Sequence, residues 1–335
     1  MPSNGRLGMA AAFSRSLLSW YVDGGSRPLS ASFAITNRCN LRCSYCNTPF
    51  LDPNDLPLDK IELIFDRLAT FGVKRIGLSG GEPMVRKDLG EIVAAAKQRG
   101  FRVTMNSNLL LLNRRREQVK DVDLFFTSLD GDREAHEAAR GKGAYDGVLD
   151  AIGSLVAERR PVVAICVVSE HSLDQADHLL DLAERGGFRV HFQPRCTDTE
   201  IVRGSIPTDL SNDRQREFWN RLRTLKRQGR PVASSGPYLE ALSRWEDFRV
   251  SAIADPAARC AASRGFLFID PHGHAYPCAY TKGKAPAIDL LGDDWKSAVG
   301  RETPCSRCSV GPHLEFNLLY QQPIRTGLSL LGSYI

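Results

Sequence analysis

The chain has 335 residues, of which 42% are hydrophobic and 25% charged, and a formal net charge of +5. This composition is that of a globular protein with one large core and room for a smaller second domain, and it excludes a disordered chain. The small positive charge argues only weakly for an anionic partner. The nine cysteines are too sparse for a secreted disulfide scaffold and gather at metal-ligand spacings, which indicates a reducing compartment.

The first predicted element is a helix over residues 7–22, where apolar side chains recur at helical spacing. Arg15 interrupts a run that is already too short to cross a bilayer, so we expect an amphipathic helix and no transmembrane segment. This helix belongs to a lead-in over residues 1–30 and packs on the main domain or touches a membrane interface. Because nothing in it resembles a signal-peptide cleavage site, we expect a cytoplasmic protein, either free or peripheral at a membrane.

From residue 32 onward, short apolar runs alternate with longer helical patterns, which is typical of βα units around a parallel sheet. The predicted strands cover residues 32–36, 75–78, 102–105, 124–128, 162–168 and 189–192. The predicted helices cover residues 59–71, 89–99, 114–119, 145–158 and 173–185. Six such units predict an α/β fold, a partial (β/α)6 TIM-like barrel over residues 31–200, with its chemistry at the carboxyl ends of the strands.

A cysteine motif follows the first predicted strand. Cys39, Cys43 and Cys46 have the spacing C-x3-C-x2-C, with Tyr45 just before the last cysteine. Three thiolates fill only three corners of a tetrahedral zinc site, whereas a four-iron cluster can keep one iron open for a substrate. The alternatives are a zinc knuckle and three unrelated buried thiols.

Polar or glycine-rich segments follow the later strands as well. They contain Gly80, Gly81 and Glu82 after the second strand, Asn106 after the third, Ser128 and then Arg140 after the fourth, and Gln193 to Cys196 after the sixth. Such segments also occur in turns and helix caps, so each has a purely local explanation. Their common position at strand ends nevertheless predicts that they face one mouth of the barrel.

Together these motifs resemble those of the radical SAM superfamily. The resemblance implies that Cys39, Cys43 and Cys46 hold a catalytic [4Fe-4S] cluster, whose open iron binds S-adenosylmethionine (SAM). An electron from the reduced cluster then cleaves SAM to a 5′-deoxyadenosyl radical, which abstracts hydrogen from an unactivated carbon of the substrate. An electron donor such as flavodoxin or ferredoxin is implied as a partner.

The resemblance also assigns the SAM contacts. The Gly-Gly-Glu-Pro segment with Gly80, Gly81 and Glu82 receives the SAM ammonium group, and Tyr45 lies beside the cofactor. Ser128 and Arg140 are implied to hold the SAM carboxylate and Asn106 the ribose.

A second cysteine group lies in residues 256–320 and consists of Cys260, Cys278, Cys305 and Cys308. Residues 266–269 and 275–279 within this region predict a β-hairpin. The spacing C-x12-G-x4-C followed by C-x2-C resembles the start of the SPASM pattern, in the shortened form called twitch. It implies one auxiliary [4Fe-4S] cluster, which acts in electron transfer or as a structural staple. A zinc site that uses His272, His274 or His313 is the alternative.

Residues 201–255 are predicted to be a linker and helices, with an arginine-rich helix over residues 212–229. This helix presents a solvated face or a docking surface for an acidic or phosphate-bearing substrate. The apolar segment 316–320 and the tail over residues 321–335 are expected to cap the open side of the barrel or to contact a hydrophobic substrate.

We therefore expect a radical SAM enzyme, an oxidoreductase or a transferase, that modifies a peptide or protein. One alternative is modification of, or adenosyl transfer to, an isoprenoid lipid or another small molecule. The short lead-in leaves no room for a leader-peptide-binding domain, so a peptide substrate would need a separate protein for that task. An alternative of another class is a non-catalytic, metal-braced protein that binds nucleic acid or a partner, although a binding module has no need of an ammonium seat.

Overall fold

The computed structural model describes residues 21–22, 25, 27–196, 199 and 210–331. The predicted amphipathic helix over residues 7–22 lies outside the described residues except for its last two positions. No helix in the described ranges is both long and apolar enough to cross a membrane.

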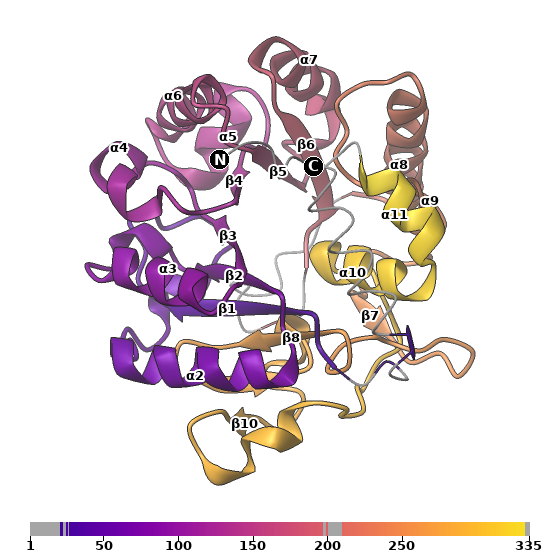
Figure 1. Cartoon of the computed structure of the whole chain (residues 1–335). Coiled ribbons are helices and arrows are strands. Elements are labelled where there is room, and N and C mark those ends of the chain that lie inside the picture. Colours follow the sequence, from indigo (N-terminus) through magenta and orange to yellow (C-terminus); the bar gives the residue numbers. More distant parts are fainter. Residues whose placement is uncertain (1–20, 23–24, 26, 197–198, 200–209, 332–335) are drawn as a thin grey trace.

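The described residues form a main sheet of nine strands in the order β10-β9-β8-β1-β2-β3-β4-β5-β6. Its first six strands in the chain are parallel and curve into the partial barrel shown in Figure 1, which confirms the predicted fold class. These strands are β1 (Ser30–Thr36), β2 (Arg75–Gly80), β3 (Arg102–Asn106), β4 (Leu124–Ser128), β5 (Val162–Val168) and β6 (Arg189–Pro194).

Helices cover the outer face of the barrel (Figure 1). They are α2 (Leu58–Phe71), α3 (Leu89–Gln98), α4 (Leu112–Arg115), α5 (Arg133–Arg140), α6 (Ala144–Ala157), α7 (Ala176–Gly186), α8 (Asn212–Arg227) and α9 (Gly236–Ser243). Short 3-10 turns occur at Thr48–Phe50, Pro83–Val85, Arg116–Val119 and Leu173–Gln175. The last two replace parts of predicted α-helices.

Helix α5 was not predicted because the apolar positions of its sequence, REAHEAAR, are occupied only by alanine and not by large hydrophobic residues. Its start is nevertheless marked, since the Asp132 carboxylate accepts a hydrogen bond of 3.0 Å from the backbone N–H of Ala135. This N-cap satisfies a donor that the helix itself cannot pair, so local hydrogen bonding defines the helix where hydrophobic periodicity does not.

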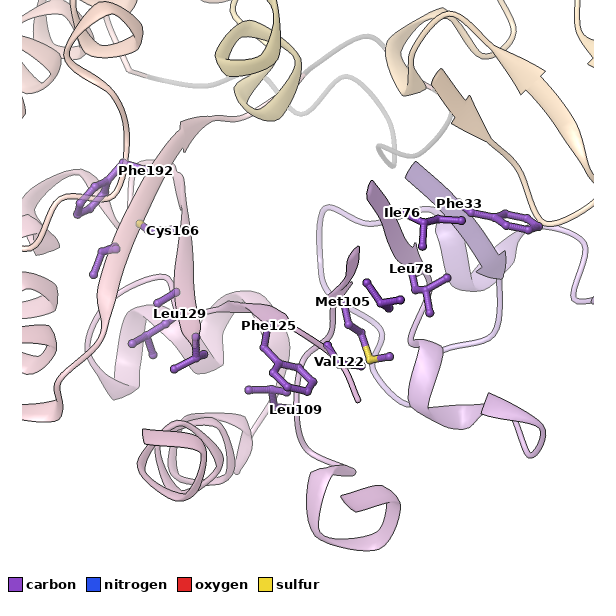
Figure 2. Close-up of a cluster of buried hydrophobic side chains, with 14 of the residues drawn as sticks. Phe33, Ile76, Leu78, Met105, Leu109, Val122, Phe125, Leu129, Cys166 and Phe192 are labelled. Carbon is purple, nitrogen blue, oxygen red and sulfur yellow. The ribbon is translucent and has the colours of Figure 1, made fainter. Parts of the chain in front are cut away.

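Alternating side chains on the strands separate the core from the barrel interior. On β1, Phe33 and Ile35 are fully buried toward the helices, while Ser30 and Ser32 face a central cavity. Figure 2 shows the same apolar layer along the sheet, from Phe33 through Met105 and Phe125 to Phe192. Cys166 also lies in this layer and is fully buried, as its apolar surroundings in the sequence predict.

The C-terminal region extends the sheet beyond β1. Strand β8 (Phe266–Ile269) pairs in parallel with β1, and β9 (His274–Tyr276) and β10 (Ile288–Asp289) follow in antiparallel order. The predicted hairpin is therefore present, but it joins the barrel sheet. Strands β7 (Ala252–Ile253) and β11 (Arg307–Cys308) form a small separate sheet. Two 3-10 turns, Ala279–Thr281 and Asp293–Ala298, complete this region.

Helix α10 (Gly311–Gln321) lies across the open side of the barrel, between β6 and β8, and α11 (Pro323–Leu331) continues from it (Figure 1). The rings of His313, Phe316 and Tyr320 on α10 pack on Phe266 of β8, with centroids 5.5 to 6.4 Å apart. This is the capping position that the apolar segment 316–320 predicts.

The arginine-rich helix α8 forms ion pairs with acidic residues of α7 and the turn before it. Arg214 pairs with Asp174 and Arg221 with Asp177. Arg230, which follows the helix, pairs with Asp181 and Glu184. These pairs are largely exposed and contribute little to stability, but they neutralise the arginines concerned. These ion pairs therefore weaken the hypothesis that this helix is a docking surface for an acidic or phosphate-bearing substrate.

Phe65 is central to the packing between the helices and the sheet. It is fully buried and contacts Phe33 and Phe101 edge to face, at 6.2 and 5.9 Å. We predict that Phe65→Ala lowers the free energy of unfolding by about 3–5 kcal/mol, because it leaves a cavity in a dense core. Urea unfolding followed by circular dichroism measures this, with the exposed Val250→Ala as a control that costs about 0.5 kcal/mol or less. Equal losses in both variants would contradict the prediction.

Candidate active site

A cavity of about 1390 Å³ lies inside the barrel and is lined by residues from both ends of the parallel strands. Small and polar residues on the inward faces of the strands form much of its wall. Its lining includes the following residues predicted from the sequence: Cys39, Cys43, Tyr45, Cys46, Gly80, Gly81, Asn106, Ser128 and Arg140. The structure thus brings the ends of four different strands to one site.

The cysteine loop follows β1 and is tied to its surroundings on two sides. The backbone N–H of Ser44 donates a 2.9 Å hydrogen bond to the Ala139 carbonyl on α5, and the N–H of Cys46 donates to Cys43 across a tight turn. At the base of the loop, the buried Arg86 guanidinium donates to the carbonyl oxygens of Ile35 and Leu56, each at 2.9 Å. Arg86 therefore anchors both ends of this loop, and no sequence motif marks it for that role.

The three thiols of the loop interact electrostatically. Burial, together with the nearby charges of Glu82, Cys43 and Cys46, raises the pKa of Cys39 to about 11. Burial likewise raises the pKa of Cys43, with Arg140 acting in the opposite direction. Thiolates in such a place need a compensating positive charge, which a bound metal cluster supplies. The donor set therefore fits a cluster with three cysteine ligands.

All nine cysteines are free thiols. Across the part of the chain that the structure describes, no three His, Cys, Asp or Glu side chains are gathered closely enough to hold a single metal ion.

Arg140 connects the cysteine loop to β4 and β5. Its Nε donates a 2.6 Å hydrogen bond to Asp130, its Nη1 lies 3.9 Å from the Cys43 sulfur, and its guanidinium stacks over the Tyr45 ring at 5.6 Å. The other Asp130 oxygen accepts from the backbone N–H of Val167 at 3.0 Å. Asp130 thus holds Arg140 in place and does not cap a helix, whereas Asp132 does.

The glycine segment after β2 approaches the cysteine loop more closely than any other residue type would permit. Gly80 has φ of +131°, and a methyl group on it would overlap the Thr36 carbonyl; a methyl on Gly81 would overlap the Arg38 carbonyl. Backbone N–H groups of Gly81 and Glu82 donate 2.8 Å hydrogen bonds to those same two carbonyl oxygens. The segment is thereby fixed against the start of the cysteine loop.

Glu82 is buried and its carboxylate is directed into the protein. It accepts hydrogen bonds from the backbone N–H of Met84 at 2.9 Å, the Ser107 hydroxyl at 2.8 Å and the backbone N–H of Asn108 at 2.7 Å. Burial raises its pKa to about 7, although the three hydrogen bonds oppose that shift. Its contacts in the structure therefore join the loops after β2 and β3, and a direct contact with the SAM ammonium stays a prediction.

The loop after β3 completes this side of the cavity. Asn106 and Ser128 both line the cavity, at the ends of β3 and β4. The Asn108 side chain donates a 2.8 Å hydrogen bond to Asn40 in the cysteine loop. Sequence reasoning missed Ser107 and Asn108 as supporting residues, although they stand directly after Asn106.

The second cysteine group lies beside β8 and the start of α10. Burial raises the pKa of Cys278 to about 12, with the charges of Cys260 and Cys305 adding to the shift. Burial also raises the pKa of Cys308, and the charges of Cys278, Cys260 and Cys305 add to it. The four thiols are thus near enough to influence one another's charge, although the chain separates them widely.

The histidines considered as zinc ligands have other neighbours. His272 lies 3.8 Å from Asp52, His274 lies 3.5 Å from Asp270, and His313 is stacked on Phe266. The four cysteines are therefore the better-supported donor set for the auxiliary site.

We predict that Gly81→Ala disrupts the site. A methyl group at this position displaces the Arg38 carbonyl, so the cysteine loop shifts, and we expect at least a severalfold loss of iron incorporation and of SAM binding. The control is Gly153→Ala on helix α6, where nothing lies within 4 Å of the added methyl group. Iron content and equilibrium dialysis of SAM measure the difference; a Gly81→Ala protein that matches Gly153→Ala would refute this explanation.

Protonation of Glu82 should make the free energy of unfolding depend on pH. Because its pKa rises from 4.5 to about 7 on folding, the native state holds the extra proton, and the contribution of this group to stability falls as pH increases from about 4.5 to 7. Glu82→Gln removes that dependence, so between pH 5 and 8 the wild type should lose up to about 3 kcal/mol relative to the variant. Urea unfolding at several pH values measures it. Ser107→Ala keeps the acid and removes one hydrogen bond that opposes the pKa shift, so its stability should fall with pH at least as steeply as that of the wild type. A constant difference between wild type and Glu82→Gln would contradict the assignment.

Comparison with known proteins agrees with this geometry. The Radical SAM superfamily model matches residues 33–183. Fe-coproporphyrin III synthase of Methanosarcina barkeri is 32% identical over 228 residues, which cover 61% of this chain and 56% of that protein. Mycofactocin maturase MftC of Mycolicibacterium smegmatis is 27% identical over 296 residues, which cover 83% of this chain and 71% of that protein.

Solved structures share the fold. Streptococcus suis SuiB bound to S-adenosylmethionine has a TM-score of 0.67 at 16% identity, over 84% of this chain and 67% of SuiB. The protein anSMEcpe with bound AdoMet has a TM-score of 0.64 at 15% identity, over 82% of this chain and 78% of its own. Residues 33–183 match the superfamily model and contain both the cysteine loop after β1 and the glycine segment after β2. This part of the chain therefore forms a radical SAM domain.

Proposed function

We propose that this chain is a radical SAM enzyme that removes a hydrogen atom from an unactivated carbon of a peptide substrate. The observation that carries the proposal is the convergence of three free thiols, on the loop after β1, with the glycine segment after β2 at the mouth of one cavity. When bound, the cluster supplies the electron that splits SAM.

Different residues of the chain bind the cluster and SAM. In this proposal, Cys39, Cys43 and Cys46 hold three irons of the cluster, and the backbone of Gly80 and Gly81 lies beside the amino-acid end of SAM. Asn106 and Ser128 offer polar groups to the rest of SAM from the next two strands. The dense apolar layer behind the strands closes the wall of the barrel, and shielding of the reacting carbon from bulk water inside it is part of this proposal.

Arg140 acts on the cluster loop in this proposal and not on SAM alone. Its guanidinium lies beside the Cys43 sulfur and over Tyr45, where a positive charge favours the thiolate form of Cys43. The carboxylate of Asp130 keeps it there. Contact between Arg140 and the SAM carboxylate stays compatible with this position, since Arg140 also lines the cavity.

A peptide is the substrate class that we favour. MftC is named a maturase, and SuiB has been solved bound to its precursor peptide SuiA. Pockets for single small molecules usually measure about 300–1,000 Å³, so a cavity of about 1390 Å³ accommodates SAM and a part of a second ligand.

A small molecule is the second candidate, because Fe-coproporphyrin III synthase is among the similar proteins and the chain spans only 56% of it. Adenosyl transfer to an isoprenoid lipid belongs to the same class.

We further propose that Cys260, Cys278, Cys305 and Cys308 hold an auxiliary [4Fe-4S] cluster. With four thiolate ligands this cluster has no open iron, so it exchanges electrons with the substrate or braces the region. A small reducing protein such as flavodoxin or ferredoxin is the proposed electron donor. Structural zinc at the same four thiols is the competing assignment.

The metal content of cysteine variants tests both sites. After anaerobic reconstitution, we expect about eight irons in the wild type and about four in the Cys39→Ala/Cys43→Ala/Cys46→Ala variant, since each cluster holds four. Cys305→Ala/Cys308→Ala should also retain about four. The EPR spectrum of the reduced protein should change on adding SAM in the wild type and not in the triple variant. Zinc in place of four irons would disprove the auxiliary cluster, and an iron-free wild type would disprove the radical chemistry.

Substrate class is tested separately by measuring 5′-deoxyadenosine release under reducing conditions. We expect peptides encoded near the gene to accelerate release and to change mass. Acceleration by a porphyrin or an isoprenoid, but by none of these peptides, would favour the second candidate.

A further inference from the structure

Helix α5 presents a buried polar face to the cysteine loop. His136 and Arg140 are four positions apart, so they lie on the same side of the helix. His136 is buried, and the side chain of Arg140 is only 9% exposed. In the last turn, the Ala139 carbonyl accepts a 2.9 Å hydrogen bond from the backbone N–H of Ser44 in the loop. The end of this helix is therefore attached to the loop that carries the three cysteines.

The Arg140 guanidinium uses different nitrogens for its two partners. Its Nε donates to Asp130 at 2.6 Å, and its Nη1 donates to the Cys43 sulfur at 3.9 Å. Because the two bonds start from separate N–H groups, Arg140 makes both at once. Burial raises the pKa of Cys43, and Arg140 lowers that pKa more than Asp130 raises it. The sulfur therefore experiences the positive member of this ion pair more strongly than the negative member.

Asp130 is itself fixed by groups on both sides. Its backbone N–H donates a 3.3 Å hydrogen bond to Nδ1 of His136, and its second carboxylate oxygen accepts one of 3.0 Å from the backbone N–H of Val167. Burial lowers the pKa of His136 to about 4, so the ring is neutral and its Nδ1 can accept. Asp130 consequently holds Arg140 in one orientation before any ligand binds.

The other arginines of the cysteine loop are directed elsewhere. The exposed Arg38 donates from Nε to Asp55 at 3.0 Å, and the exposed Arg42 lies over the Phe50 ring at 5.2 Å. Among the residues that the structure describes, Arg140 is the one arginine whose guanidinium donates to a sulfur of this loop. Its contact is therefore specific to Cys43 and is not part of a general positive surface.

A guanidinium at this place has an electrostatic consequence for a bound iron–sulfur cluster. Reduction adds one negative charge to the cluster and its thiolates, and hydrogen bonds to the sulfurs are among the factors that set the reduction potential. A nearby positive charge stabilises the reduced form more than the oxidised form. Because the side chains of Arg140 and Asp130 are only 9% and 5% exposed, water and salt screen this effect little.

We propose that Arg140, positioned by Asp130, raises the reduction potential of the cluster bound by the loop after β1. One electron passes from the reducing partner to the cluster, and no covalent bond is formed or broken in this step. The inference rests on the proposed function, because it requires that cluster. It gives Arg140 a role before SAM binds, whereas contact with the SAM carboxylate gives it a role only afterwards.

A redox titration followed by EPR, on the reconstituted full-length protein without SAM, tests the proposal. The signal to follow is the one that is absent from the Cys39→Ala/Cys43→Ala/Cys46→Ala variant. We expect Arg140→Gln to lower the equilibrium constant for reduction about tenfold, which is about the effect of one charge-assisted hydrogen bond and lowers the potential by about 59 mV.

Two further variants separate charge from position. Arg140→Lys keeps the positive charge but loses the planar guanidinium, so it should lower the potential less than Arg140→Gln does. Arg133→Gln is the control, since it removes the same charge from the exposed start of the same helix, where Arg133 pairs with Asp146. Water screens a charge there, and we expect the wild-type potential.

Isotope labelling tests the position of Arg140 directly. We would label the guanidinium groups of all arginines with 15N and record electron spin echo envelope modulation of the reduced protein without SAM. The wild type should show a 15N coupling to the cluster, and Arg140→Gln should lose it although every other arginine remains. Asp130→Ala should also lose the coupling, because the arginine is no longer held at the sulfur.

Several results would overturn the proposal. Equal potentials of wild type and Arg140→Gln, with weaker SAM binding in the variant, would mean that Arg140 serves SAM alone. A coupling that survives Asp130→Ala would give the positioning role to another group. If Arg140→Gln binds no iron, Arg140→Lys and the labelled wild type still decide, and a wild type without 15N coupling would count against the proposal. An iron-free wild type would refute the proposed function, whereas a loaded wild type with an unshifted Arg140→Gln variant refutes this inference alone.

Discussion

The approach of the glycine segment to the cysteine loop determines how the rest of the site is built. Gly80 and Gly81 bring the backbone after β2 against the carbonyls of Thr36 and Arg38, where any side chain would collide. Glu82 is the next residue, and its carboxylate accepts hydrogen bonds from the Ser107 hydroxyl and the Asn108 backbone N–H after β3. Each strand end is therefore positioned by the one before it, and a displacement at the glycines would pass along this edge of the barrel.

The two cysteine groups are linked to the cavity in different ways. The first is part of its rim, on the loop after β1. The second lies outside the rim but only a short distance before α10, since Cys308 belongs to β11 and α10 begins at Gly311. The second group is thus next in the chain to the start of α10, and residues of α10 line the same cavity as the first group.

Much of this arrangement could be predicted from the sequence. The six strands and the cysteine motif follow from apolar periodicity and local spacing, which need no knowledge of distant contacts. The pairing of β8 with β1 could not be foreseen, because it joins segments more than two hundred residues apart. Arg140 was identified by resemblance to a family motif, and that motif does not say that the Asp130 carboxylate, close by in the chain, is its partner. Glu82 was found by its motif, yet its contacts depend on a loop that the motif does not include.

Helix α10, which contributes to the lining of the cavity, is held in place by contacts on two sides. The Tyr320 hydroxyl donates to the Gly265 carbonyl at 2.7 Å, and the Asn317 side chain accepts from the backbone N–H of Ala261. On the inner side, the Arg75 guanidinium lies on the Phe316 ring while it donates to Ser30 and Thr104 of the neighbouring strands. The helix is thereby attached to the start of β8 and to the floor of the barrel. A helix held at both places keeps the side chains that it presents to the cavity at fixed positions, and fixed polar groups discriminate between ligands that differ by one hydrogen bond.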